Sequence, residues 1–207
     1  MADVSEFMSI PPTTLADLLG REQVMDIGIR PLWSSMPRQA GPAFTVRCRP
    51  GDNLMVHAAI HRAEPGSVIV VESGDVDYAL VGGNVCAVAQ RRGISGFVLD
   101  GVIRDVAEAR EIGFPVFARG VIPVPGTKTA VEPLNLPVRC GGVKVDPGDI
   151  VVADEEGLVV VPNARQEEVL LAARAKLAKE ADESLEAWEE AHRTRINKIL
   201  DENGFQG

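Results

Sequence analysis

Short apolar runs separated by helix-like segments fill most of the chain before residue 163. Ala43–Arg49 alternates apolar and polar residues, which predicts a half-buried strand. Continuous apolar runs predict buried strands at Ser67–Val71, Gly96–Leu99, Pro115–Ala118 and Gly157–Pro162. The stretch Gly28–Gly41, with Pro31 and Pro37, has neither period and is expected to be irregular.

Helical patterns lie between these runs. The first begins after the capping residues Thr13 and Thr14 and ends at Gly20, and the second follows Asp52 over Asn53–Ala63. The third begins near Asn84 within Tyr78–Arg92, and the fourth spans Arg104–Glu111. Strands that alternate with helices over short connections are parallel and joined by right-handed crossovers. The Pro- and Gly-rich residues 123–147 favour an antiparallel or mixed region. The pattern predicts an α/β fold with a mixed sheet.

The C-terminal part has a different character. Ala164–Asn203 contains no Pro or Gly, which predicts one long helix or two joined helices. Its apolar stripe is narrow and too long for one small domain to cover. We therefore expect residues 1–163 to form an α/β core domain that carries the site, and residues 164–207 to form a helical extension that packs on a neighbouring subunit. The alternative is a helix on its own domain with a frayed end.

Composition narrows the function classes. A chain of 207 residues with a net charge of -9 is not a general nucleic-acid binder, which needs a basic surface. No apolar run approaches the roughly 20 residues of a membrane span. The start, MADVSEFMSIPP, lacks the basic and apolar regions of a secretory signal. Three widely spaced cysteines indicate reduced thiols. We expect a cytoplasmic protein.

Two glycine-containing turns are the candidate site. Gly82 and Gly83 lack side chains, so they let the backbone approach a ligand, and the N–H groups of Asn84, Val85 and Cys86 are expected to be free at a helix start. Such amides bind a carboxylate or phosphate.

The second turn is Asp100-Gly101, which follows the strand that ends at Leu99 and leads to a helix starting near Arg104. In open α/β sheets, ligands lie at the carboxyl ends of strands. Both turns are therefore expected to open onto one pocket.

Arg104 and Asp105 carry the candidate chemistry. On a helix, neighbours point about 100° apart, so we expect the two side chains not to pair but to reach around one ligand. The helix dipole favours an ionised Asp105, which suits a divalent cation such as Mg²⁺. The fork of Arg104 suits a carboxylate or a developing enolate oxygen. The alternative is a helix cap with a surface charge.

The run GGNVCAVAQRRGISGFVLDGVIRD, continued by EIGFPVFARGVIPVPGTK, resembles the 4-hydroxy-4-methyl-2-oxoglutarate and 4-carboxy-4-hydroxy-2-oxoadipate aldolases. That family includes the regulator of ribonuclease E activity (RraA-like proteins) and proteins once labelled dimethylmenaquinone methyltransferases. The resemblance extends from about Ala43 to Pro162. It implies an α/β sandwich like the swivelling phosphohistidine domain, with a long C-terminal helix, assembled as a homotrimer or homohexamer.

The resemblance also implies roles for individual residues. Asp105 matches the ligand of Mg²⁺ or Mn²⁺, and Arg104 matches the residue that contacts the pyruvate portion of the substrate. The turn from Gly82 to Cys86 matches the amides that hold the pyruvyl carboxylate. Several members have an acidic residue where this chain has Asn84, which cannot act as a base.

In some members an acidic residue of a neighbouring C-terminal helix completes the site. Glu180 and Glu183 are the candidates here, and the sequence does not choose between them.

The implied activity is that of a class II pyruvate aldolase. Metal and Arg104 would stabilise the enolate left when the C3–C4 bond of a small oxo-acid breaks, and oxaloacetate would give the same enolate on losing CO₂. The rival hypothesis is a non-enzymatic regulator that binds a ribonuclease E-type partner. The residue that reads the group at C4 stays open among Arg119, Lys128 and Arg139. His57 and His61 are interpreted as helix-face residues, because HExxH is absent.

Overall fold

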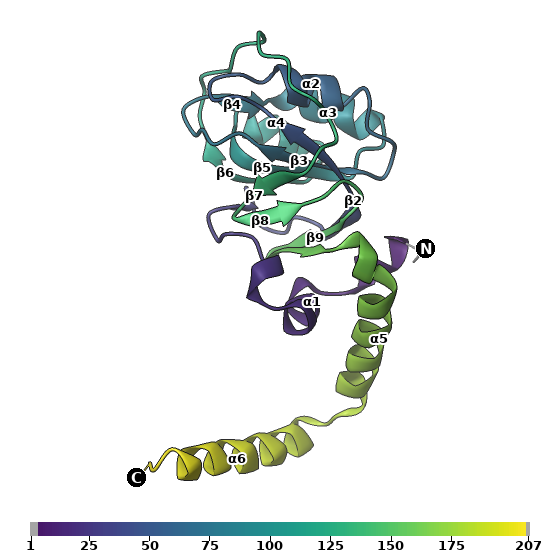
Figure 1. Ribbon diagram of the computed structural model, residues 1–207, viewed down its shortest axis with the longest axis vertical. Helices are drawn as coiled ribbons and strands as arrows, with labels where there is room; N and C mark the ends of the chain where they lie inside the picture. Colours follow the sequence, from purple (N-terminus) through teal and green to yellow (C-terminus); the bar gives the residue numbers. More distant parts are fainter. Residues whose placement is uncertain (1–3, 206–207) are drawn as a thin grey trace. The chain divides into compact units, whose positions relative to one another are not determined.

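The first compact unit is built on a mixed sheet, shown in Figure 1. The computed structural model describes residues 4–205, so residues 1–3 and 206–207 of the two predicted domains lie outside it. The sheet contains β1 (Arg30–Pro31), β2 (Gln39–Arg47), β3 (Val68–Glu72), β4 (Ala79–Val81), β5 (Gly96–Ile103), β6 (Val116–Val121), β9 (Ile150–Asp154) and β10 (Gly157–Val161).

The strand order is β1-β6-β5-β3-β2-β9-β10, with β4 paired to β5. The pairs β2/β3, β3/β5, β4/β5 and β5/β6 are parallel, whereas β1/β6, β2/β9 and β9/β10 are antiparallel. The two edge strands, β1 and β10, come into contact, so the sheet is nearly closed. The predicted α/β fold with a mixed sheet is confirmed.

The two faces of the sheet have separate cores, because successive side chains of a strand point to opposite faces. Ile69 and Val71 pack with residues of the helices α2 (Leu54–Ala59), α3 (Gly83–Arg91) and α4 (Val106–Glu111). Figure 1 shows these three helices gathered together. Val68 and Val70 pack instead with the hairpin β7 (Val138–Cys140) and β8 (Val143–Val145), which lies in the region predicted to be antiparallel.

Some boundaries differ from the sequence prediction for identifiable reasons. The segment expected to be irregular contributes β1 and the start of β2, because β1 pairs with β6 and Gln39–Pro42 pairs with the unpredicted strand β9. Asp100-Gly101 is not a turn, since β5 continues to Ile103 past an irregularity between Leu99 and Val102. Glycine is needed at position 101 for space: a Cβ there would lie 2.7 Å from both Leu80 and Ser73.

The helix α1 (Pro12–Leu19) follows the short 3-10 helix η1 (Val4–Ser9) and precedes η2 (Arg21–Gln23). Its N-cap is Pro11, which makes no side-chain hydrogen bond, so the predicted threonine cap is wrong. The helix can start earlier than predicted because proline at the first helical position already has the backbone angle of a helix. It ends at Gly20 as predicted, where φ is 89°. Asp52 lies just before α2, whose Leu54 N–H donates to its carboxylate at 2.8 Å.

The C-terminal part forms two helices, one of the two predicted alternatives. After η3 (Asn163–Arg165) come α5 (Gln166–Asp182) and α6 (Leu185–Glu202), separated where the Ser184 hydroxyl accepts the Ala187 N–H at 3.2 Å and so caps α6. The division into compact units falls inside α5, between Ala173 and Arg174. The second unit is Arg174–Gly207. None of the helices between residues 4 and 205 has the length and apolarity that crossing a membrane requires.

Candidate functional site

The carboxyl ends of two adjacent parallel strands create the site. Val81, the last residue of β4, pairs with Ile103, the last residue of β5. Gly82 and Gly83 follow the first strand, and Arg104 and Asp105 follow the second. Because parallel neighbours end at the same edge, residues distant in sequence meet there. Gly82, Arg104 and Asp105 line one pocket, so the two junctions converge as predicted, although the second is made by Arg104 and Asp105 and not by a turn at Asp100-Gly101.

Asp105 connects the two junctions. It has a left-handed backbone, with φ 55°, and is the N-cap of α4. Its carboxylate accepts a hydrogen bond from the Gly83 N–H at 3.3 Å and lies 3.3 Å from Nε of Arg104. The expectation that Arg104 and Asp105 do not pair is wrong, because both residues precede α4 and the helical spacing does not apply to them.

The two glycines are required by close packing rather than by φ. A Cβ on Gly82 would lie 2.5 Å from the Asp105 carboxylate and 3.1 Å from the Arg104 side chain. A Cβ on Gly83 would lie 1.8 Å from a carboxylate oxygen of Glu108 and 2.8 Å from its Cβ. The sequence predicted that a ligand would approach these two glycines closely. In the structure, the side chains of Asp105 and Glu108 approach them. Any larger residue in this turn would displace Asp105 or the first turn of α4.

The amides of the turn are less open than predicted. Val85 and Cys86 donate their N–H groups to the Gly82 carbonyl, at 3.0 and 3.1 Å, because the first turn of α3 closes on that oxygen. The Gly83 N–H is used by Asp105. Within the part of the chain that the structure describes, Asn84 retains the one unpartnered amide of this set. The site therefore offers a ligand one backbone donor rather than three.

The pocket is small and polar, with a volume of about 70 Å³. Gly83 and Cys86 are buried and do not line the pocket. Residues from four stretches of the chain line it: Asn53, His57, Ala79, Val81, Gly82, Asn84, Val85, Arg104, Asp105, Pro125 and Lys128.

Sequence reasoning did not place Asn53 or His57 in the site. Both come from the start of α2, which follows β2, another parallel strand that ends at this edge. The rule for the carboxyl ends of strands would have found them. Burial lowers the pKa of His57 to about 4, and the positive charges of Lys128 and Arg104 act in the same direction. The imidazole is therefore neutral at physiological pH.

Asp52 fixes the segment that carries Lys128. Its carboxylate accepts hydrogen bonds from the hydroxyls of Thr127 and Thr129, at 2.9 and 3.0 Å, and from the N–H groups of Thr129 and Ala130, at 2.7 and 3.2 Å. Burial acts to raise the pKa of this carboxyl, but the hydrogen bonds outweigh it and hold the pKa well below its usual value. Lys128 is thus presented to the pocket from an anchored loop.

Of the three residues left open for reading the far end of a substrate, Lys128 alone lies on the pocket wall. Arg119 pairs with Asp100 and, at 3.0 Å, with Asp26. Arg139 donates to the Gly142 carbonyl at 2.6 Å. Both arginines are held by the protein itself, so the structure separates them from the site.

The thiol of Cys86 is not suited to nucleophilic chemistry. It is fully buried, and burial together with the negative charge of Asp105 raises its pKa to about 12. Residues 4–205 contain no group of three or more His, Cys, Asp or Glu side chains that could hold a metal ion. A metal at this site would take Asp105 and complete its shell from solvent, ligand or a second chain.

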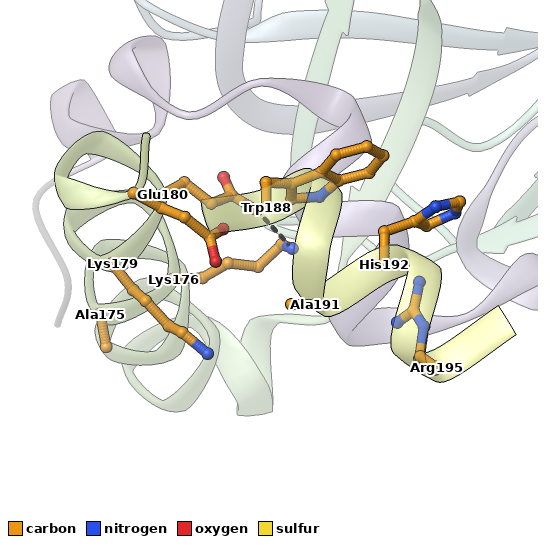
Figure 2. Close-up of a pocket in the computed structure, with 9 residues that line it drawn as sticks. Ala175, Lys176, Lys179, Glu180, Trp188, Ala191, His192 and Arg195 are labelled. Atoms are coloured by element: carbon orange, nitrogen blue, oxygen red, sulfur yellow. Dashed lines mark ion pairs between the residues drawn. The ribbon is translucent and has the colours of Figure 1, made fainter. Parts of the chain in front are cut away.

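A larger hollow of about 600 Å³ lies in the second unit, between α5 and α6 (Figure 2). Lys176 and Glu180 pair at 2.7 Å one turn apart on α5, and Trp188 stacks on His192 with ring centroids 4.6 Å apart. Glu180 and Glu183, the two acidic residues predicted to reach a neighbouring site, line this hollow. Its walls are long exposed side chains and α6 has no buried residue, so it lacks the fixed groups that chemistry requires.

Comparisons with known proteins show which family the chain resembles. The profile of the RraA-like family, described as Aldolase/RraA, matches residues 2–160. A protein of Halalkalibacterium halodurans, provisionally named a 4-hydroxy-4-methyl-2-oxoglutarate aldolase, is 39% identical over 176 residues, which cover 84% of this chain and 83% of that protein.

Two solved structures extend the comparison. An uncharacterised protein from Pseudomonas syringae pv. tomato has a TM-score of 0.78 at 30% identity, and 92% of each chain is covered. The RNA-processing inhibitor RraA from Thermus thermophilis has a TM-score of 0.67 at 30% identity, over 73% of this chain and 92% of that chain. The matched residues include both junctions of the site, and the chain belongs to the Aldolase/RraA family.

Proposed function

We propose that this protein is a divalent-metal-dependent class II aldolase that releases pyruvate from 4-hydroxy-2-oxo acids, such as 4-hydroxy-4-methyl-2-oxoglutarate or 4-carboxy-4-hydroxy-2-oxoadipate, and that also decarboxylates oxaloacetate. One observation carries the proposal. The Asp105 carboxylate and the Arg104 guanidinium lie 3.3 Å apart in a small polar pocket where β4 and β5 end. The aldolase name of the Halalkalibacterium relative supports it.

The donor set fits Mg²⁺ or Mn²⁺. The side chain of Asp105 is 39% exposed, so one face of its carboxylate is open to an ion. Mg²⁺ gives up water reluctantly and is often held by only one or two carboxylates together with substrate oxygens. When bound, the ion would act as a Lewis acid on the 2-oxo group.

The chain's own residues bind and orient the substrate. Arg104 holds the oxo-acid end and faces the oxygen on which negative charge develops. The free Asn84 N–H adds one donor to the same end. As the C4 hydroxyl gives up its proton to a water molecule, C4 becomes the carbonyl carbon of the second product and the C3–C4 bond breaks. The electron pair of that bond passes into the pyruvate enolate, and a proton returned from water to C3 then gives pyruvate. Oxaloacetate gives the same enolate when the bond to its departing CO₂ breaks, so one site serves both reactions.

Assembly into a homotrimer or homohexamer belongs to the same proposal. Four large apolar side chains of α6 are exposed: Leu185, Trp188, Ile196 and Ile199. Packing against a second copy would remove them from water. Such a contact would also give Glu180 or Glu183 a route to a neighbouring site.

The proposal is tested with purified protein and a coupled assay for pyruvate. Mg²⁺ or Mn²⁺ should support pyruvate release from 4-hydroxy-4-methyl-2-oxoglutarate and from oxaloacetate, and chelation should abolish both. A folded, metal-loaded protein that releases no pyruvate from either compound, or from 4-carboxy-4-hydroxy-2-oxoadipate, contradicts the proposal.

A second candidate function is regulation of a ribonuclease E-type partner, favoured by the similarity to the Thermus inhibitor of RNA processing. An acidic surface is compatible with a basic protein partner. The variant Asp105→Ala separates the two functions. An enzyme loses metal-dependent turnover, whereas a regulator that acts through its surface keeps its inhibition of the partner.

A further inference from the structure

The side-chain oxygen of Asn53 is buried at the pocket wall without a hydrogen-bond partner. Asn53 is 3% exposed and lines the pocket, and its Oδ1 is the one buried side-chain polar atom left unpartnered in the described part of the chain. The amide nitrogen is already used, because Nδ2 donates to the Ala79 carbonyl at 3.1 Å. That bond fixes which way the amide lies. A buried acceptor without a donor costs free energy, so a ligand that supplies a donor is favoured here.

Asn53 is hydrogen-bonded to two of the segments that line the pocket. Its side chain is bound to Ala79 of β4, the strand that leads to Gly82, and its backbone N–H donates to Thr127 at 2.8 Å, beside Lys128. Asn53, Arg104 and Lys128 line the same pocket, so one small ligand can meet all three side chains. The ammonium of Lys128 makes no hydrogen bond or ion pair to any side chain or carbonyl of residues 4–205.

The charges in the pocket restrict the donor. Arg104 and Lys128 are positive and Asp105 is negative, while the lowered pKa of His57 keeps that ring neutral. An ammonium group on the ligand would be repelled by the two cations. Carboxylates and carbonyls accept hydrogen bonds and cannot donate them. The donor that fits the oxygen of Asn53 is therefore a neutral hydroxyl.

We propose that Asn53 is a specificity-determining residue: its Oδ1 accepts a hydrogen bond from a hydroxyl on the distal half of the ligand, and Lys128 holds a carboxylate beyond that hydroxyl. The identity of the ligand as a small oxo-acid rests on the proposed function. The hydrogen bond itself is a property of the pocket. A site built around a substrate hydroxyl rejects the analogue that lacks it, since its own polar group is then left unpaired.

Three compounds that lack the 2-oxo group, and so cannot be cleaved, test the proposal by calorimetry in the presence of Mg²⁺. 2,4-Dihydroxyglutarate and 2-hydroxyglutarate differ only in the distal hydroxyl, and 2-hydroxyvalerate also lacks the distal carboxylate. The wild-type protein should bind the first about tenfold more tightly than the second, as expected for one hydrogen bond to a buried acceptor. It should bind the second more tightly than the third.

Variants assign each preference to its residue. Asn53→Leu should abolish the preference for the distal hydroxyl and keep the preference for the distal carboxylate, whereas Lys128→Met should do the reverse. Gln166→Leu is the matched control. Gln166 is also a buried amide that donates to a backbone carbonyl, that of Gly148 at 3.1 Å, but it lies outside the pocket. It should lower stability without changing either preference.

The comparison of ligands in the wild-type protein needs no variant, so it stands even where Asn53→Leu fails to fold. Equal binding of the first two compounds, which would mean that water alone satisfies the oxygen, overturns the proposal. So does an unchanged preference in a folded Asn53→Leu protein, or binding of none of the three. Pyruvate release by the wild-type enzyme is measured separately, so failure of the proposed function and failure of this assignment are distinguishable.

Discussion

The carboxylate of Asp105 accepts a hydrogen bond from the backbone N–H of Gly83, at 3.3 Å and across 22 residues of sequence. This contact joins the ends of β4 and β5. It places a carboxylate, a guanidinium and the start of α3 around one small pocket.

Replacing Asp105 with Asn should abolish metal-dependent turnover and leave the fold intact. Asn accepts the left-handed backbone that Asp105 adopts, with φ 55°, and its oxygen can still accept the Gly83 N–H. It cannot supply an anionic ligand. We expect kcat/KM to fall by more than about a hundredfold, since changes to outer-shell partners of metals alone cost roughly 10–100-fold. Thermal unfolding should shift little, which circular dichroism checks; a fully active Asp105→Asn protein would remove the metal role from this residue.

Gly83→Ala should destabilise the protein, because the added Cβ would meet both the carboxylate and the Cβ of Glu108. We expect a loss of about 1–3 kcal/mol in the free energy of unfolding, as for other overpacked sites, and reduced turnover as the two helix starts move apart. Glu108→Ala in the same chain should recover part of the stability. Gly120→Ala is the control, since its nearest neighbour is 3.9 Å away. Equal urea midpoints for the Gly83 and Gly120 variants would refute the packing argument.

The stability contributed by Asp52 should disappear in acid. The folded-state pKa of this carboxyl lies below its usual 3.8, so the stabilisation is complete above about pH 4 and is lost as the pH falls toward the folded-state pKa. Asp52→Asn should therefore flatten the acid side of the stability profile, measured as the urea midpoint from pH 7 down to pH 3.

The same variant should raise KM more than it lowers kcat, because Asp52 anchors Thr127 and Thr129 on either side of Lys128. Asp77→Asn, at an exposed position, should change neither the stability profile nor KM. If Asp52→Asn keeps the acid sensitivity of the wild type, the carboxylate is not the anchor.

His57 should stay neutral well below pH 6. Its folded-state pKa is about 4, against the usual 6.5, so the unfolded chain binds a proton that the folded chain does not, and stability falls as the pH goes from 6.5 to 4. A titration of its ring protons by NMR checks the folded-state pKa. His57→Gln should reduce the loss of stability over that window. A ring that protonates near pH 6.5 in the folded protein would contradict the burial argument.

The sequence was sufficient to predict the site's two junctions but not how they are built. The motif around Arg104 and Asp105 predicted the right neighbourhood, because strand ends and glycine turns are local signals. The pairing of Arg104 with Asp105 was missed, since it depends on α4 starting at Val106 rather than at Arg104. Boundaries of this kind are set by tertiary contacts, such as those that extend β5 through Gly101.

Asn53 and His57 were also missed, for a related reason. Their segment precedes the motif by about 30 residues, and no local pattern marks α2 as part of a pocket. The parallel pairing of β2 with β3 is what brings this helix start to the same edge of the sheet. Position in the sheet, rather than residue type, made these two residues part of the site.

The most direct test of the central claim is a crystal structure with Mn²⁺ and oxalate, a stable analogue of the pyruvate enolate. The account predicts an anomalous Mn²⁺ peak beside the Asp105 carboxylate, with oxalate bound between the ion and the Arg104 guanidinium, near the Asn84 N–H. Mn²⁺ bound elsewhere in a well-ordered crystal, with the space beside Asp105 filled by solvent alone, would contradict it.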